Sequence, residues 1–435
     1  MRRILASLSL RSSLGKIRKS TFARNAGWLM AGQGASLLFQ AINFVFLARL
    51  IGSTEYGVFV GAFAFTNLLA IYCSNGTGYV FLRHVSGRPS EYPAYFGNIL
   101  MATSSLSVLM IVALTLLSTH FLNPASARLV FLLAIGNCLF APLTMAVGQV
   151  FQAFEKMKTT ATLGLIVTAL RAIAVVVLIL TMHHATAFEW AIVSTVVSGL
   201  AAVAALVLAV TRFGWPVFDV ALARKHFLEG LNFAFAGSTS SVYNDIDKTM
   251  LSHYGLNQAN GVYSMAYRVI DLSSVPIYAV RDAAYPKLFQ LGRDGIAKSA
   301  DYARRLLYRS LLIGVGISLI LFLTAPIIPI LAGAGFAQSV SALRWLAIIP
   351  VFRSIHQMKG VVLTSSGRQV VRTTSQLAIA IFNFGLNLWL IPLYGWLGAA
   401  WASIASDGAL ALIMWFAVRV LVRRSARGTE QISKL

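Results

Sequence analysis

Residues 159–182, TTATLGLIVTALRAIAVVVLILTM, form an apolar run in which Arg171 is the only charge. A helix needs about 20 such residues to cross the hydrocarbon core of a bilayer, which is roughly 30 Å thick. A second run, residues 188–211, follows after a short connection. Strands of a membrane barrel would instead show segments of about 10 residues in which apolar and polar side chains alternate. This stretch therefore predicts two consecutive transmembrane helices.

The same pattern recurs along the whole chain. Of its residues, 57% are hydrophobic and 11% are charged, whereas about a quarter of the residues in a soluble domain are charged. A surface this poor in charge has to face lipid, where helices satisfy their own backbone hydrogen bonds. We therefore predict an all-α integral membrane protein with about twelve transmembrane helices. The runs lie at residues 26–50, 56–80, 95–118, 128–150, 159–182, 188–211, 231–253, 262–285, 308–332, 338–364, 372–393 and 395–421.

Lysine and arginine are confined to alternate connections between these runs. The basic set comprises both termini and residues 82–94, 151–158, 212–230, 286–307 and 365–371. The other set holds no lysine or arginine and comprises residues 51–55, 119–127, 183–187, 254–261, 333–337 and 394. By the positive-inside rule, this bias predicts that both termini are cytoplasmic. It also accounts for the net charge of +22 without a nucleic-acid partner, which would require a basic face on a soluble domain.

The order of the runs predicts two six-helix bundles. Residues 52–59, GSTEYGVF, and residues 255–263, GLNQANGVY, resemble each other and occupy the same place in each half. Because each half has an even number of crossings, a pseudo-two-fold axis along the membrane normal would relate the bundles. The predicted parts are a basic N-terminal tail (1–25), a first bundle (26–211), a cytoplasmic linker (212–230), a second bundle (231–421) and a C-terminal tail (422–435).

Ionisable residues inside the predicted spans point to function. Each costs about 2.5–3.5 kcal/mol near the bilayer centre unless it has a partner or water. Two local pairs would satisfy some of them, Asp245 with Lys248 and Arg268 with Asp271, since residues three apart share a helix face. Seven of the twelve are basic. They are Arg171, Asp245, Asp247, Lys248, Arg268, Asp271, Arg281, Asp282, Arg344, Arg353, Lys359 and Asp407.

A polar cavity with surplus cations is the interpretation we favour for the rest. Arg353, His356 and Lys359 form a basic stripe without an acid on the same helix, and Arg171 stands alone in its run. With Lys248 and Arg268, they would suit an anionic substrate, because guanidinium and ammonium groups hold phosphate through charge-assisted hydrogen bonds.

Neutral polar residues could complete the lining of such a cavity. Asn383 and Asn387 could hydrogen-bond a sugar or a neighbouring helix, and the first run offers Gln33, Gln40 and Asn43. The carboxylates Asp245, Asp247, Asp271 and Asp407 are candidates for ion coupling or for pairing.

The sequence holds no catalytic constellation. It lacks a Walker loop, and its connections are too short for a domain that carries acid–base residues. His183 and His184 lie in the short connection 183–187, which belongs to the set without lysine or arginine. We predict that they form a solvated turn rather than a metal site. We therefore expect a transporter that is not an enzyme and has neither a resident metal nor a cofactor.

Several motifs together resemble a known family. They are NAGW at 25–28, FLARLIG at 46–52, EYG at 55–57, QAFEKMK at 152–158, YNDIDK at 243–248, GVYSMAYR at 261–268, GR at 367–368, and Asn387 followed by IPLYGWLGAA at 391–400. Their order and spacing, from about residue 24 to 421, resemble the polysaccharide-transport family. This family contains O-antigen and exopolysaccharide flippases and belongs to the multidrug/oligosaccharidyl-lipid/polysaccharide superfamily.

This resemblance implies a flippase of the bacterial inner membrane. Such a protein moves an undecaprenyl-diphosphate-linked oligosaccharide from the cytoplasmic to the periplasmic leaflet by alternating access between two bundles. The resemblance also implies coupling to a proton or sodium gradient, and a polysaccharide polymerase and chain-length proteins as partners. Two alternatives stay open. A drug antiporter of the same superfamily would need acidic cavity residues in the first half, and a scaffold for polysaccharide assembly would not explain the intramembrane charges.

Overall fold

The first half of the chain folds into one helical bundle in the computed structural model, which describes residues 2–74, 76–182 and 184–432. His183 and the tail residues 433–435 lie outside the described residues. The described residues form helices and no strand. The elements of the first bundle are α1 (Arg2–Cys73), α2 (Thr77–Val85), η1 (Pro89–Glu91), α3 (Tyr92–Phe121), α4 (Pro124–Ala134), the π-helical turn η2 (Ile135–Phe140), α5 (Ala141–Ala153), α6 (Met157–Thr181) and α7 (Ala187–Phe213).

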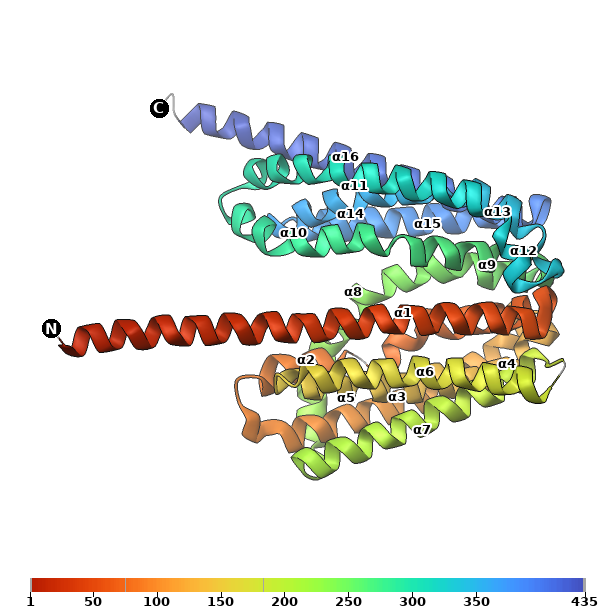
Figure 1. Cartoon of the computed structure of the whole chain (residues 1–435), viewed down its shortest axis with the longest axis horizontal. Helices are drawn as coiled ribbons and strands as arrows, with labels where there is room; N and C mark the ends of the chain where they lie inside the picture. Colours follow the sequence, from red (N-terminus) through yellow and green to blue (C-terminus); the bar gives the residue numbers. More distant parts are fainter. Residues whose placement is uncertain (1, 75, 183, 433–435) are drawn as a thin grey trace.

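The second half forms a matching bundle, which lies on one side of α1 in Figure 1, while the other helices of the first bundle lie on the opposite side. Its first helix, α8, runs without interruption from the connection after α7 into the second bundle, so this helix begins earlier than residue 231. The elements are α8 (Val220–His253), α9 (Asn257–Ser273), α10 (Val275–Arg293), α11 (Ile296–Thr324), α12 (Ile327–Ala332), η3 (Ala334–Phe336), α13 (Ser339–Leu346), α14 (Ile349–Ser365), α15 (Gln369–Tyr394) and α16 (Trp396–Ile432).

These helices agree with about twelve crossings. Eight described helices are long and apolar enough to span a membrane, and α13 with α14, bent by 46°, adds a ninth. One of the eight, Gly27–Val85, contains the break at Gly52, where φ is 77° and the chain turns back. α8 and the pair α9–α10 supply the remaining crossings. They are less apolar because they carry Asp245, Lys248 and the other charges noted above.

The outward surface of the bundles is apolar. On α3, for example, Val108, Leu109 and Leu116 are each more than half exposed. A soluble protein rarely exposes so many large apolar side chains to solvent. A helix that faces lipid, in contrast, carries apolar side chains on its outer surface. The exposed side chains therefore mark the surface that contacts the bilayer.

Two glycines bring the bundles together at one end. A Cβ atom on Gly57 would lie 1.8 Å from the carbonyl oxygen of Asn257, and a Cβ on Gly261 would lie 1.9 Å from that of Ser53. Each glycine thus packs on the residue four positions before the other, as a two-fold relation requires. Asn260 reinforces the contact, since its side chain donates to the Gly57 carbonyl at 3.1 Å. The two similar segments of sequence therefore face each other across the pseudo-two-fold axis.

Candidate functional site

A cavity of about 550 Å³ lies between the two bundles. α1, α6, α7 and the π-helical turn η2 supply its wall on one side, and α9 with α10 supplies the other. π-helical turns are rare and occur often at functional sites. Here the turn places Asn137 in the wall, where its side chain donates to the Thr66 hydroxyl at 2.8 Å. The polar and ionisable side chains of the lining are Gln40, Asn43, Tyr56, Asn137, Thr168, Arg171, Ser194, Thr195, Ser198, Arg268, Asp271 and Tyr278.

Two arginines face this cavity from opposite bundles. Arg171 lies on α6, and its Nη2 donates to the Ser198 hydroxyl at 2.8 Å. Its buried Nε has no hydrogen-bond partner among the described residues. Arg268 lies on α9, beside Tyr56 of α1. Within the part of the chain that the structure describes, neither arginine forms an ion pair with a carboxylate. Two arginines without a direct carboxylate partner in the described part of the chain therefore face the cavity.

Arg171 also borders a second cavity. This space, of about 600 Å³, lies against α2, α5 and α6, and Thr168, Arg171 and Ser198 line both cavities. The two spaces therefore adjoin at Arg171.

The basic stripe of α14 (Arg353, His356 and Lys359), which we predicted to line a substrate cavity, does not line this central cavity. Arg353 is buried and donates to Asp271 Oδ1 at 2.8 Å and to the Tyr267 hydroxyl at 3.2 Å. His356 Nε2 lies 3.3 Å from a carboxylate oxygen of Asp407, which is on α16. Lys359 is buried as well. Arg353 and His356 thus have acidic partners on other helices, which the spacing along α14 does not reveal.

The two local pairs expected from sequence do not form either. Lys248 pairs with its neighbour Asp247 at 3.0 Å, and the hydroxyl of Tyr263 donates to the same carboxylate. Asp245 instead accepts a hydrogen bond of 2.6 Å from the side chain of Asn67, in the other bundle. Asp271 pairs with Arg353 instead of Arg268, and Arg268 lines the central cavity.

The remaining polar candidates divide between packing and lining. Asn383 donates to the Ser406 hydroxyl on α16 at 3.0 Å, a contact between helices. Asn387 donates to Asn383 at 2.9 Å within α15. Gln40 and Asn43 line the central cavity, whereas Gln33 lies exposed on α1.

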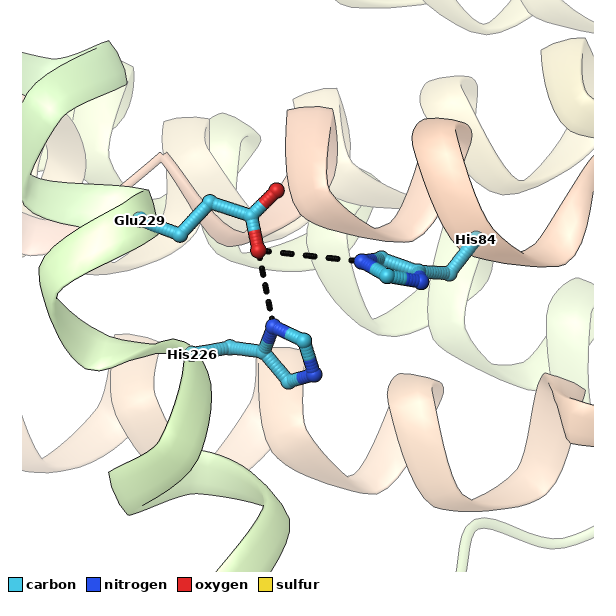
Figure 2. A group of neighbouring side chains, drawn as sticks. All are labelled: His84, His226 and Glu229. Atoms are coloured by element: carbon cyan, nitrogen blue, oxygen red, sulfur yellow. Dashed lines mark hydrogen bonds and ion pairs between the residues drawn. The ribbon is translucent and has the colours of Figure 1, made fainter.

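A group that the sequence analysis missed lies apart from the cavity. His84 on α2 meets His226 and Glu229 on α8 (Figure 2). His226 Nδ1 lies 2.8 Å from Glu229 Oε2, and His84 Nε2 lies 3.6 Å from the same oxygen. The spacing of His226 and Glu229, three apart on a helix, could have drawn attention to the group. No local pattern points to His84, which lies far away in the sequence.

Comparison with known proteins places this chain in a family. A family model described as a polysaccharide biosynthesis protein matches residues 22–291. A putative O-antigen transporter of Escherichia coli (strain K12) is 23% identical over 416 residues, which cover 92% of this chain and 97% of that protein. An uncharacterized membrane protein, MJ1068 of Methanocaldococcus jannaschii, is 23% identical over 202 residues. That match covers 46% of this chain and 39% of the relative's length.

Solved structures share the fold at low sequence identity. The lipid II flippase MurJ, in an inward closed conformation, has a TM-score of 0.71 at 13% identity, with 90% of this chain and 87% of that chain covered. An inward-facing multidrug resistance MATE family transporter of the MOP superfamily has a TM-score of 0.70 at 14% identity, with 90% and 96% covered. The family match extends over more than half of the chain, and the fold agrees with it over nearly the whole length. The chain therefore belongs to the polysaccharide biosynthesis protein family.

Proposed function

We propose that this protein is a flippase for a lipid-linked oligosaccharide. Its substrate would be one polysaccharide repeat unit on undecaprenyl diphosphate, moved from the cytoplasmic to the periplasmic leaflet for O-antigen, capsule or exopolysaccharide synthesis. The observation that carries the proposal is the pair Arg171 and Arg268, which face one cavity from opposite bundles without a carboxylate partner among the described residues. A diphosphate between them would gain charge-assisted hydrogen bonds from both sides.

The neutral lining suits the sugar part of this substrate. Gln40, Asn43, Asn137 and Ser194 offer donors and acceptors within the same cavity. Aromatic rings of Tyr56 and Trp190 add flat apolar faces, and such a mixture of apolar wall and a few polar groups is typical of ligand pockets. The adjoining second cavity supplies room for a repeat unit of several sugars.

Alternating access provides the mechanism that we propose. The contact between Gly57 and Gly261 closes the end of the bundles that the charge bias assigns to the periplasm. In this state the cavity would receive the substrate from the cytoplasmic side. Separation of the glycines and closure of the opposite end would then release it to the periplasmic leaflet. We further propose that a proton or sodium gradient drives this cycle, with Asp245 as a candidate because its bond to Asn67 joins the two bundles.

Export of a cationic drug fits the same cavity less well. Among the described lining residues, one carries a carboxylate, Asp271, and this carboxylate forms an ion pair with Arg353. An organic cation would therefore meet the two arginines and no free anion. This balance of charge favours the anionic substrate.

The test is to remove the two charges without changing the fold. Arg171→Gln and Arg268→Gln retain hydrogen-bonding groups, and Arg344→Gln is the matched control because Arg344 is an exposed arginine on α13. Each purified variant would be reconstituted into proteoliposomes that contain undecaprenyl-diphosphate oligosaccharide. A membrane-impermeant oxidant would modify only the sugars on the outer leaflet, and the modified fraction would report which leaflet holds the sugar. A hydrogen bond to a charged group contributes about 1.5–3 kcal/mol, so each variant should lose about tenfold or more in rate. Unchanged transport by the double variant would exclude the two arginines from the site.

A further inference from the structure

His84, His226 and Glu229 form a compact group of metal-ligand atoms at the junction of α2 and α8 (Figure 2). One ligand atom from each residue lies within 4.8 Å of the other two. The histidines approach the same carboxylate oxygen, at 2.8 and 3.6 Å. Nitrogen and oxygen ligands of tetrahedral zinc lie about 2.0–2.2 Å from the ion, so two ligands are about 3.3 Å apart. Small shifts of the side chains would therefore admit an ion.

Neighbouring residues hold the two rings in orientations that suit ligation. The hydroxyl of Tyr95 lies 3.3 Å from His226 Nε2, the ring nitrogen that points away from Glu229. A histidine ligand usually has its second nitrogen held in this way, which fixes the ring. The Tyr95 ring also stacks on His84, with ring centroids 5.1 Å apart. The side chain of His226 is 9% exposed, and those of Glu229 and His84 are 23% and 30% exposed, so an ion could enter from solvent.

A hydrogen-bonded cluster alone does not account for every atom of the group. Glu229 is satisfied by Arg83, at 2.9 Å from Oε1, and by His226 at Oε2. His84 Nε2 is buried and has no hydrogen-bond partner among the described residues.

We infer that His84, His226 and Glu229 bind a divalent transition metal ion such as Zn²⁺, with water as the fourth ligand. Two imidazoles and one carboxylate favour zinc and its neighbours over Mg²⁺ or Ca²⁺, which prefer oxygen ligands. The site joins α2 of the first bundle to the beginning of α8, which continues into the second bundle. A bound ion would therefore clamp the connection between the bundles. This site is separate from the transport cavity and does not depend on the proposed substrate.

The test is metal binding by the full chain, purified with a tag that contains no histidine and stripped with a chelator. Isothermal titration with Zn²⁺ should give one ion per chain at micromolar affinity or tighter. Co²⁺ should give the visible absorption bands of a tetrahedral site. His84→Ala, His226→Ala and Glu229→Gln should each weaken binding by tenfold or more. His253→Ala is the matched control, since His253 lies on the same helix and contacts the Phe121 carbonyl instead.

Two results would overturn the inference. One is the absence of zinc binding below about millimolar concentration by the wild-type chain, because a three-ligand protein site binds far more tightly. The other is unchanged affinity in a His84→Ala, His226→Ala double variant. If a histidine variant aggregates, Glu229→Gln replaces it, because glutamine keeps the shape of the side chain. Tetrahedral Co²⁺ bands as strong in Glu229→Gln as in the wild type would then contradict the inference. None of these measurements depends on transport activity. The metal site would therefore be confirmed or contradicted even if the proposed substrate is wrong.

Discussion

At the scale of single residues, burial determines how much stability the protein loses when one partner of an ion pair is removed. Asp247 and Lys248 are adjacent in sequence and almost completely buried, with 3% and 8% of their side chains exposed. Arg281 and Asp282 form a similar pair of neighbours at 2.7 Å, but Asp282 is 57% exposed. Removal of one partner from a buried pair leaves an uncompensated charge, whereas an exposed pair is replaced by water.

We therefore predict unequal effects of two matched substitutions. Asp247→Ala should lower the free energy of unfolding by about 3–5 kcal/mol, because Lys248 remains buried without its partner. Asp282→Ala should change it by less than about 1 kcal/mol. Thermal unfolding in detergent, followed by intrinsic fluorescence, measures both. Equal melting temperatures for the two variants would show that Lys248 reaches water. A double variant, Asp247→Ala with Lys248→Met, should regain much of the loss.

The sequence can draw attention to a single residue where one helix carries the signal. Arg171 and Arg268 stand out as cations in apolar surroundings, and both line the central cavity. The partners of Arg353 and His356 could not be found in this way, since Asp271 is 82 positions from Arg353 and Asp407 lies on another helix. The spacing of residues along a helix identifies possible partners three or four positions away. It gives no information about pairs between residues on different helices.

At the scale of helices, the contact of Gly57 with Gly261 determines how closely the bundles approach at one end. A side chain at either position would collide with a backbone carbonyl, which cannot turn away as a flexible side chain can. Asn123 supports the same contact, since it caps α4 and donates to the Ser252 carbonyl at 2.6 Å. The short similar segments in the sequence indicated a repeat, but their mutual contact required the structure.

We predict that Gly57→Ala opens this end. The added methyl group should destabilise the closed arrangement by about 1–3 kcal/mol, as overpacking does in tightly packed interiors. Spin labels at Ala125 and Ala337, two exposed positions on different bundles, should show a shift to longer distances in double electron–electron resonance. The labelled protein would need Cys73→Ser and Cys138→Ser, because the two native cysteines are free thiols.

Gly316→Ala is the control for this shift. Gly316 lies within α11, and a methyl group added there would have no neighbouring atom within 4 Å, so alanine fits without displacement. Its distance distribution should match that of the parent protein. A Gly57→Ala distribution identical to the control would mean that the bundles close without this contact.

At the scale of the whole molecule, composition and charge placement carried the prediction furthest. Apolar length and the alternation of basic connections predicted an all-helical membrane protein of about twelve crossings, and the fold agrees. Helix boundaries were predicted less well. α8 begins at Val220 rather than near 231, because a polar helix has no hydropathy signal to distinguish it from a connection.

The orientation of the chain is open to a direct test. The bias of lysine and arginine predicts that Ser90, in a basic connection, faces the cytoplasm and that Ala125 faces the periplasm. Both positions are exposed. In a chain without native cysteines, Ala125→Cys should react with a membrane-impermeant maleimide on intact cells, and Ser90→Cys should react only after the inner membrane is opened. The reverse pattern would invert the proposed direction of transport.

The pairing of charges between distant helices also constrains how the chain enters the membrane during synthesis. α8 and the pair α9–α10 are not among the described helices that are apolar enough to span on their own. Asp271 meets Arg353 only after 82 further residues have been made, and a lone carboxylate in lipid costs about 2.5–3.5 kcal/mol. The insertion machinery must therefore shelter these segments until α14 arrives. The second bundle would then be delivered to the bilayer as a group, and a chain truncated before α14 should be degraded by quality-control proteases.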